Sequence, residues 1–244
     1  MYLSIEALVL KAFDLKETDQ LLTLFSREMG KIPVVAKGVK KAQSSLRGLV
    51  QPFCHSQFYL TPSGELHLIT QGKINEFFGN IREDLNKTLQ AMYILELLDK
   101  STVDRDPNQA LFNLALQVLR HIENSPLSSL SLRYFEIKLV HLLGLAPVLD
   151  RCTNCGRAED LVCFSRSNGG VLCRECAPQF EVTRILPPVL GVFRTLQQNG
   201  LTILSRLRLP DSTLDQLEAI LEGYLEYHLE RKLNIKHVIR DLNR

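Results

Sequence analysis

Long apolar runs are missing from this sequence of 244 residues. The most apolar stretch, Leu139 to Leu149, contains His141 and Pro147. It falls far short of the roughly 18 residues that a membrane-spanning helix needs. The first six residues have no basic region ahead of an apolar one, so no secretory signal is expected. These absences predict a cytoplasmic protein, in which cysteines are more often metal ligands or catalytic groups than disulfides.

Recognisable catalytic motifs are missing as well. The sequence has no P-loop, no G-x-S-x-G, no H-E-x-x-H and no paired-carboxylate motif. Its six histidines lack metal-ligand spacing, and His141 and His228 fall in predicted helices, where a structural role is expected. The sequence therefore favours a protein that is not an enzyme.

Acidic residues are missing between Glu28 and Glu65, although the interval carries five cations. These are Lys31, Lys37, Lys40, Lys41 and Arg47. The segment from residue 37 to residue 48 has two glycines, two serines and no apolar period, which is typical of a loop. A charge run is often only a solvated surface. On a flexible loop after a strand, however, such cations can also neutralise phosphates and release counterions.

The first 80 residues are predicted to be β-structure. Five short apolar, β-branched segments indicate strands, with a turn at 61–64: 5–13, 21–25, 32–36, 56–60 and 66–74. Five short strands with turn-rich links suggest a small barrel such as an OB-fold, whose exposed face commonly binds single strands. Most aromatic residues here are expected in the core. Phe53 and Tyr59 are the candidates for exposed stacking.

From about residue 85 the apolar period changes from two to about 3.6. Helices are predicted near 85–97, 107–122 and 129–143, and again after residue 184. Asp106-Pro107 is expected to be an N-cap followed by proline at the first helical position. Ser212 and Asp215 resemble a capping box. Because each apolar stripe is too short to be stable alone, the helices are expected to pack into one domain.

Four cysteines have the spacing of a metal site. Cys152, Cys155, Cys173 and Cys176 form C-x2-C-x17-C-x2-C, which is typical of zinc held by four thiolates. Asn168-Gly169 predicts a hairpin that brings the two pairs together. Four protein ligands leave no open position, so one structural Zn²⁺ is expected. The alternatives are free, disulfide-forming or redox-active cysteines.

Several ordered segments resemble the bacterial DNA repair protein RecO family of recombination mediators. They are Lys16 to Phe25, Gly30-Lys31, Val34 to Gly38, Leu46 to Phe53, Ser131 to Glu136 and Leu142 to Gly144. The predicted fold class is α+β, with an N-terminal OB-fold β-barrel followed by an all-α domain that carries a zinc-ribbon-like insertion. The expected domains are 1–80 (OB-fold), 81–150 with 180–244 (helical) and 151–179 (zinc-binding insertion).

The resemblance implies a function in DNA repair and homologous recombination, without enzymatic turnover. Family members bind single- and double-stranded DNA and anneal complementary strands. With RecR they help load RecA onto DNA coated with single-strand-binding protein (SSB), in the pathway that also includes RecF. The five cations above become the expected DNA contacts. Arg133 becomes the expected contact for the acidic, apolar SSB tail, and a nucleoid-associated location follows.

Three other functions remain open at this point. OB-folds and zinc ribbons also occur in RNA-binding and transcription-associated modules. The basic loop would equally suit a protein-binding scaffold with an acidic partner. A zinc enzyme would need an open metal position.

Overall fold

The computed structural model describes residues 3–64, 66–235 and 238–239. The chain forms two compact units. One consists of Met1–Pro126 with Asn234–Arg244, and the other of Leu127–Leu233. Each unit is described by itself.

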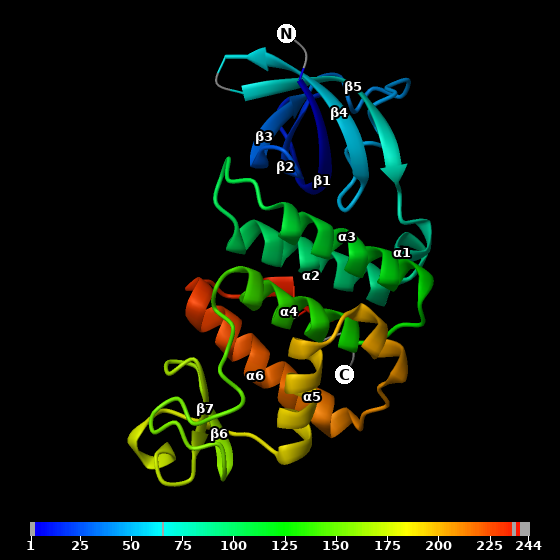
Figure 1. Ribbon diagram of the computed structural model, residues 1–244. Helices are drawn as coiled ribbons and strands as arrows, with labels where there is room; N and C mark the ends of the chain where they lie inside the picture. The colour runs from blue at the N-terminus through cyan, green and yellow to red at the C-terminus, as the bar shows by residue number, and fades with distance from the viewer. Residues whose placement is uncertain (1–2, 65, 236–237, 240–244) are drawn as a thin grey trace. The chain divides into compact units, whose positions relative to one another are not determined.

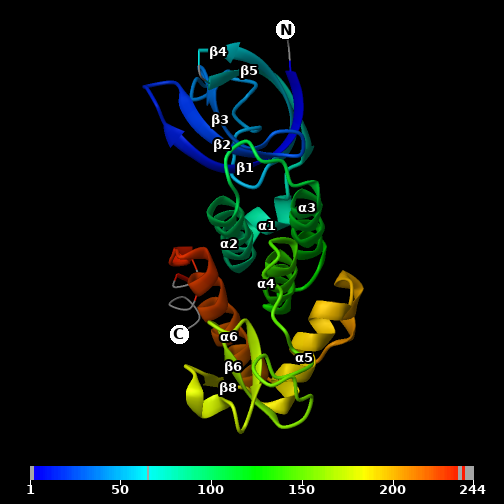
Figure 2. The same ribbon diagram turned by 60° about the vertical axis from the view of Figure 1, so that its left-hand side comes forward.

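The first unit contains a closed five-stranded barrel (Figures 1 and 2). Its strands are β1 (Leu3–Asp14), β2 (Gln20–Ser26), β3 (Gly30–Ala36), β4 (His55–Ser63) and β5 (Leu66–Glu76). Their order is β1-β2-β3-β5-β4, with β4 pairing back to β1, and only the β3–β5 pair is parallel. This is the OB-type barrel that the alternating segments predict. The turn is tighter than expected, because β4 continues to Ser63, which pairs with Leu66.

The barrel interior is filled by alternate residues of every strand. Leu22 of β2 pairs with Val34 of β3, and both are fully buried in this core. Their sequence neighbours point to the outer face, as the period of two requires. The segment between β3 and β4 adds five further core residues, namely Val39, Leu46, Leu49, Val50 and Cys54.

Among the described residues, three named helices lie in the same compact unit as the barrel, although they follow the predicted domain boundary at residue 80. They are α1 (Gly79–Glu83), α2 (Leu85–Ser101) and α3 (Gln109–Asn124). The Lys11 Nζ of β1 lies 2.6 Å from the Asp99 carboxylate of α2, and Phe112 of α3 contacts the rings of Phe25 and His55. Figures 1 and 2 both place α2 and α3 against one end of the barrel. These long-range contacts join the helices to the strands, whereas the change of apolar period falls near residue 80.

Helix α3 begins later than expected. Its N-cap is Asn108, whose side chain accepts a hydrogen bond from Leu111 N at 2.9 Å. Asp106 instead lies against Gly30, where a Cβ would sit 2.2 Å from the Asp106 carbonyl oxygen. Gly30 has φ +67°. The preceding segment therefore packs against the turn before β3, and the N-cap prediction for Asp106 is wrong.

The second unit combines helices with a small sheet. Its helices are α4 (Leu130–Leu142), α5 (Pro187–Gln198) and α6 (Asp211–Leu229), with 3-10 helices at Ala177–Gln179 and Leu201–Arg206. The sheet has the order β7-β6-β8, from β6 (Leu161–Ser165), β7 (Gly170–Cys173) and β8 (Thr183–Arg184). It therefore extends past the predicted end of the insertion at residue 179.

The local signals in this unit have mixed outcomes. The hairpin at Asn168-Gly169 is confirmed, since Ser165 pairs with Gly170 and Gly169 has φ +67°. The capping box is wrong, because Pro210 is the N-cap of α6 and no side chain caps it. Within the described residues, no helix has the length and apolar character needed to cross a membrane.

Candidate nucleic-acid interface and metal centre

The basic segment, residues 37–48, is an anchored cap of the barrel. Val39 and Leu46 insert into the barrel core, at 1% and 9% exposure, and Leu49 and Val50 follow just beyond it. We expected a flexible loop here, because no apolar period is visible. The anchors are spaced irregularly and follow successive turns, so neither a strand nor a helix period reveals them.

Two backbone contacts tie the basic segment to the β1–β2 hairpin. Gly38 N donates to the Asp19 carboxylate at 2.8 Å, and Lys40 N donates to the Thr18 carbonyl oxygen at 3.0 Å. The Gly38 hydrogen bond is the largest cause that lowers the pKa of Asp19. Gly38 has φ +63°, a conformation that glycine adopts without strain. The hairpin therefore fixes the position of the adjacent lysines.

Lys31 does not face solvent with the other cations. Its side chain is 13% exposed, and its Nζ donates to the carbonyl oxygens of Asp99 and Thr102, both at 2.8 Å. The Asp99 and Asp104 carboxylates lie 3.8 and 3.5 Å away. The expectation of an exposed phosphate contact at Lys31 is therefore wrong. Its partners lie at the end of α2 and just beyond it, about 70 residues further along the chain. The absence of acidic residues close to Lys31 in sequence therefore gave no sign of this ion pairing.

The other four predicted cations are exposed. Lys40 Nζ lies 2.7 Å from the Asp14 carboxylate, and this hydrogen bond is the main cause that lowers the pKa of Asp14. Lys37, Lys41 and Arg47 form no ion pair with any residue that the structure describes. These three cations are therefore the most available for an anionic ligand, and Lys40 would exchange one carboxylate for a phosphate.

The two aromatic candidates differ in position. Tyr59 of β4 is exposed, as expected. Phe53 is 3% exposed and has φ +52°. The Arg82 guanidinium lies 4.1 Å from the ring centres of both Phe53 and Phe77. Phe53 is thus part of a buried cation–π contact, and its predicted exposure is wrong.

Two further exposed lysines of the barrel, Lys16 and Lys73, are not among the predicted DNA contacts. Lys16 lies on the β1–β2 hairpin, whose residues Thr18 and Asp19 hold the basic segment. Lys73 lies on β5 opposite Gln57. Neither belongs to a charge run, and only the hairpin contacts relate Lys16 to the basic segment.

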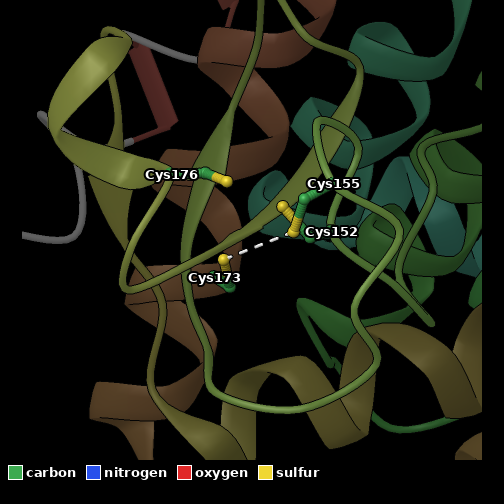
Figure 3. A group of neighbouring side chains, drawn as sticks. All are labelled: Cys152, Cys155, Cys173 and Cys176. Atoms are coloured by element: carbon green, nitrogen blue, oxygen red, sulfur yellow. Dashed lines mark hydrogen bonds between the residues drawn. The ribbon is translucent and has the colours of Figure 1, made fainter.

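The four cysteines form one cluster (Figure 3). The hairpin of β6 and β7 places Cys173 at the end of β7, near Cys152 and Cys155 of the preceding turn. All four sulfur atoms lie within 4.8 Å of one another, and Cys155 Sγ is 3.7 Å from Cys173 Sγ. A tetrahedral zinc with Zn–S near 2.3 Å requires sulfurs about 3.8 Å apart. The donor set and its spacing can therefore hold a metal ion.

The electrostatics of the cluster also favour a cation. Burial raises the pKa of Cys152, but backbone N–H groups of Cys155, Cys173 and Asn154 outweigh it and lower that pKa to about 6. The Asn154 amide lowers the pKa of Cys176, yet burial and the three neighbouring thiols raise it to about 12. Four sulfurs this close cannot all ionise unless a positive charge lies between them.

Arg133 is buried on α4, where we expected a surface arginine. Its side chain is 1% exposed. It forms ion pairs with Glu136 at 2.9 Å and with Glu218 of α6 at 3.1 Å. The expectation of surface exposure is therefore wrong, because α6, some 85 residues away in sequence, covers this face of α4.

Comparisons with known proteins divide the chain near residue 80, at the end of the barrel. Residues 1–78 match the family described as recombination protein O N terminal, and residues 82–237 match recombination protein O C terminal. The chain belongs to the RecO family. RecO proteins are named for DNA repair and recombination, and this places the chain in that functional class.

Curated relatives agree over the full length. DNA repair protein RecO of Syntrophomonas wolfei is 42% identical over 245 residues, which cover 100% of this chain and 98% of the relative. The RecO protein of Desulforamulus reducens is 39% identical and covers 94% of this chain and 90% of its own length. That of Bacillus pumilus is 34% identical, with 93% and 89% covered.

Proposed function

We propose that this RecO-family chain binds single- and double-stranded DNA through the basic segment and brings complementary strands together. Cations neutralise the phosphates of two strands and lower their mutual repulsion, while base pairing supplies the sequence specificity. The protein then acts without turnover. Together with RecR, and in the pathway that includes RecF, it helps load RecA onto SSB-coated single strands.

One observation carries this proposal. Lys37, Lys41 and Arg47 are exposed and lack ion pairs within the described residues, although the segment that bears them is anchored in the barrel core. Long cationic side chains on an ordered backbone can contact phosphates without first ordering the loop. Part of the entropic cost of binding is thereby avoided.

We assign the four-cysteine cluster to one structural zinc ion. Cys152, Cys155, Cys173 and Cys176 would all be ligands, which leaves no position for a reacting water. Arg157 lies close to the cluster but pairs with Glu175 at 2.8 Å. The ion would join the turn before β6 to the end of β7, and so stabilise the small sheet of the second unit.

The SSB tail is a proposed partner without an assigned site. Arg133 could meet its carboxylates only if α4 and α6 separated, since Glu136 and Glu218 already occupy the guanidinium. Exposing a charge from such a pair would leave its partners unpaired, at a cost of several kcal/mol. A role for Arg133 in tail binding therefore stays a prediction. The alternative is that substituting Arg133 weakens tail binding only because it destabilises the packing of α4 against α6.

The experiment is annealing of complementary oligonucleotides, bare and SSB-coated. The test variant is Lys37→Glu/Lys41→Glu/Arg47→Glu. The control is Arg206→Glu/Arg208→Glu/Arg231→Glu, which changes the net charge equally at exposed positions of the second unit. We expect the test variant to lose annealing and DNA binding while the control keeps both, with folding of each checked by circular dichroism. Equal activity of the two variants would place the DNA surface elsewhere.

A further inference from the structure

An apolar row crosses the outer face of the barrel beside the basic segment. The strand register aligns Phe13 of β1 with Leu21 of β2, and Leu21 with Val35 of β3. The neighbouring residues Leu22 and Val34 are buried in the interior, so the row points outward. Adjacent strands are about 4.8 Å apart, and the three side chains therefore span roughly 10 Å.

Phe13 is the most exposed aromatic side chain in the described part of the chain. It is 57% exposed, and Leu15, two positions further along, is 47% exposed. Among the other exposed rings of the described residues, Phe77 lies against Arg82 and Tyr227 against His228, whereas Tyr59 of β4, at 41% exposure, makes no ring contact there. Phe13 makes no ring contact with any described residue. A phenylalanine left open to water in this way presents a free face to a ligand.

Cations border the row. Lys16 is exposed on the hairpin just beyond Phe13, and Lys37 directly follows β3, two positions after Val35. Three carboxylates lie on the same hairpin: Asp19 accepts the N–H of Gly38, Asp14 pairs with Lys40, and Glu17 is exposed beside Lys16. Apolar surface and positive charge are thus adjacent on a single face.

We propose that this face is a platform for unpaired bases and that Phe13 makes the protein prefer single-stranded over double-stranded DNA. The inference rests on the proposed function. Aromatic side chains beside a cationic groove bind single strands because every base has a stacking face. In a duplex the faces of the bases are already stacked on one another, so an exposed ring gains little. The phosphates of both forms remain available to the cations.

The adjoining positive charge disfavours a purely apolar occupant. A nucleic-acid strand supplies bases for the row and phosphates for Lys16, Lys37 and Lys41 at the same time. An apolar protein partner would match the row but would leave these cations desolvated and unpaired, which is unfavourable. Single-stranded nucleic acid is therefore the occupant to which the proposal commits.

Binding of a labelled single-stranded oligonucleotide and of a hairpin duplex with the same number of nucleotides tests the platform. Anisotropy at one fixed salt concentration is measured for wild type, Phe13→Leu, Phe13→Trp and the control Phe77→Leu, which removes an exposed ring elsewhere on the same unit. For Phe13→Leu we expect single-strand affinity to fall about tenfold, equivalent to about 1.4 kcal/mol. Duplex affinity should change less than about twofold, as should both affinities of the control. Phe13→Trp should retain wild-type preference.

Three results would overturn the platform. They are unchanged single-strand affinity in Phe13→Leu, an equal loss for both DNA forms, or intact DNA affinity combined with lost annealing on SSB-coated strands, which would assign the row to a protein partner. If wild type bound neither DNA form, the proposed function itself would fail. If wild type bound DNA and Phe13→Leu had the same affinities, only the platform proposal would fail.

Discussion

Lys31 and Lys41 lie in the same acid-free interval, and substituting them should have opposite effects. Lys41 is exposed on the basic segment, whereas Lys31 is internal and bonded to two carbonyl oxygens. We predict that Lys41→Gln weakens DNA binding without altering stability. We predict that Lys31→Met lowers stability without altering the salt dependence of DNA binding.

The magnitudes follow from the contacts. Three available cations, together with Lys40 after it exchanges Asp14 for a phosphate, give about four contacts. At about −0.7 per contact, the slope of log K against log salt for a single strand is about −2.8. Lys41→Gln should reduce it to about −2.1. Between 50 and 200 mM salt the wild type should then lose affinity about 50-fold, and the variant about 20-fold.

Lys31→Met should cost stability instead. It leaves the carbonyl oxygens of Asp99 and Thr102 without the Lys31 donor, and each orphaned acceptor costs about 1–3 kcal/mol, so about 2–6 kcal/mol in total is expected. Urea denaturation measures this loss, and salt titrations of oligonucleotide binding measure the slopes. If Lys31→Met reduced the slope as much as Lys41→Gln, while the protein kept its stability, the internal role of Lys31 would be refuted. A wild-type slope near zero would refute the electrostatic account altogether.

Four further predictions concern the fold. His55→Leu should destabilise the first unit by about 2–4 kcal/mol in urea, because the buried ring lies 2.8 Å from two carboxylates that would lose their shared partner. The Arg120 hydrogen bond is the largest cause that lowers the pKa of Glu76. The stabilisation from this carboxylate should therefore be complete above about pH 4.5 and disappear as the pH falls through the lowered pKa. Over that range the difference in unfolding free energy between wild type and Glu76→Gln should shrink. Gly30→Ala should cost about 2–4 kcal/mol, since φ is +67° and the new methyl group would overlap Asp106; a neutral urea midpoint would contradict this. Replacing one cysteine of the cluster by serine should abolish stoichiometric zinc by elemental analysis and lower the melting temperature, and unchanged metal content would exclude a four-thiolate site.

Local signals predicted the strands and the hairpin, whereas the capping box at Ser212 and Asp215 failed. Alternating apolar residues predicted the five strands, and Asn168-Gly169 predicted the hairpin that brings the cysteine pairs together. The cysteine spacing itself required only two tight turns, one of which includes Gly156 at φ +76°. Each of these features depends on contacts within a short stretch of chain, so periodicity and turn chemistry are sufficient to predict it.

Predictions failed where a distant segment supplies the partner. Arg133 resembles an ordinary helix-surface arginine until Glu218 of α6 reaches it, and Lys31 resembles an exposed cation until Asp99 and Thr102 accept its hydrogen bonds. The capping signal at Asp106 was overridden by its packing against Gly30. None of these contacts is visible in the apolar periodicity of the sequence, because each depends on tertiary packing between elements that are far apart in the chain.

The charge of the candidate DNA surface illustrates the same distinction with a functional consequence. The sequence offers five cations without an intervening acid, but folding brings Asp99 to Lys31 and Asp14 to Lys40. The remaining free charge is modest, and phosphate contacts of this number do not by themselves distinguish one strand from two. A preference for single strands must then come from contacts to bases, and the exposed ring of Phe13 lies next to these cations. Folding pairs two of the five cations with carboxylates, so fewer charges are free to bind phosphates. The rest of this surface is partly apolar, and this supports a stacking role for Phe13.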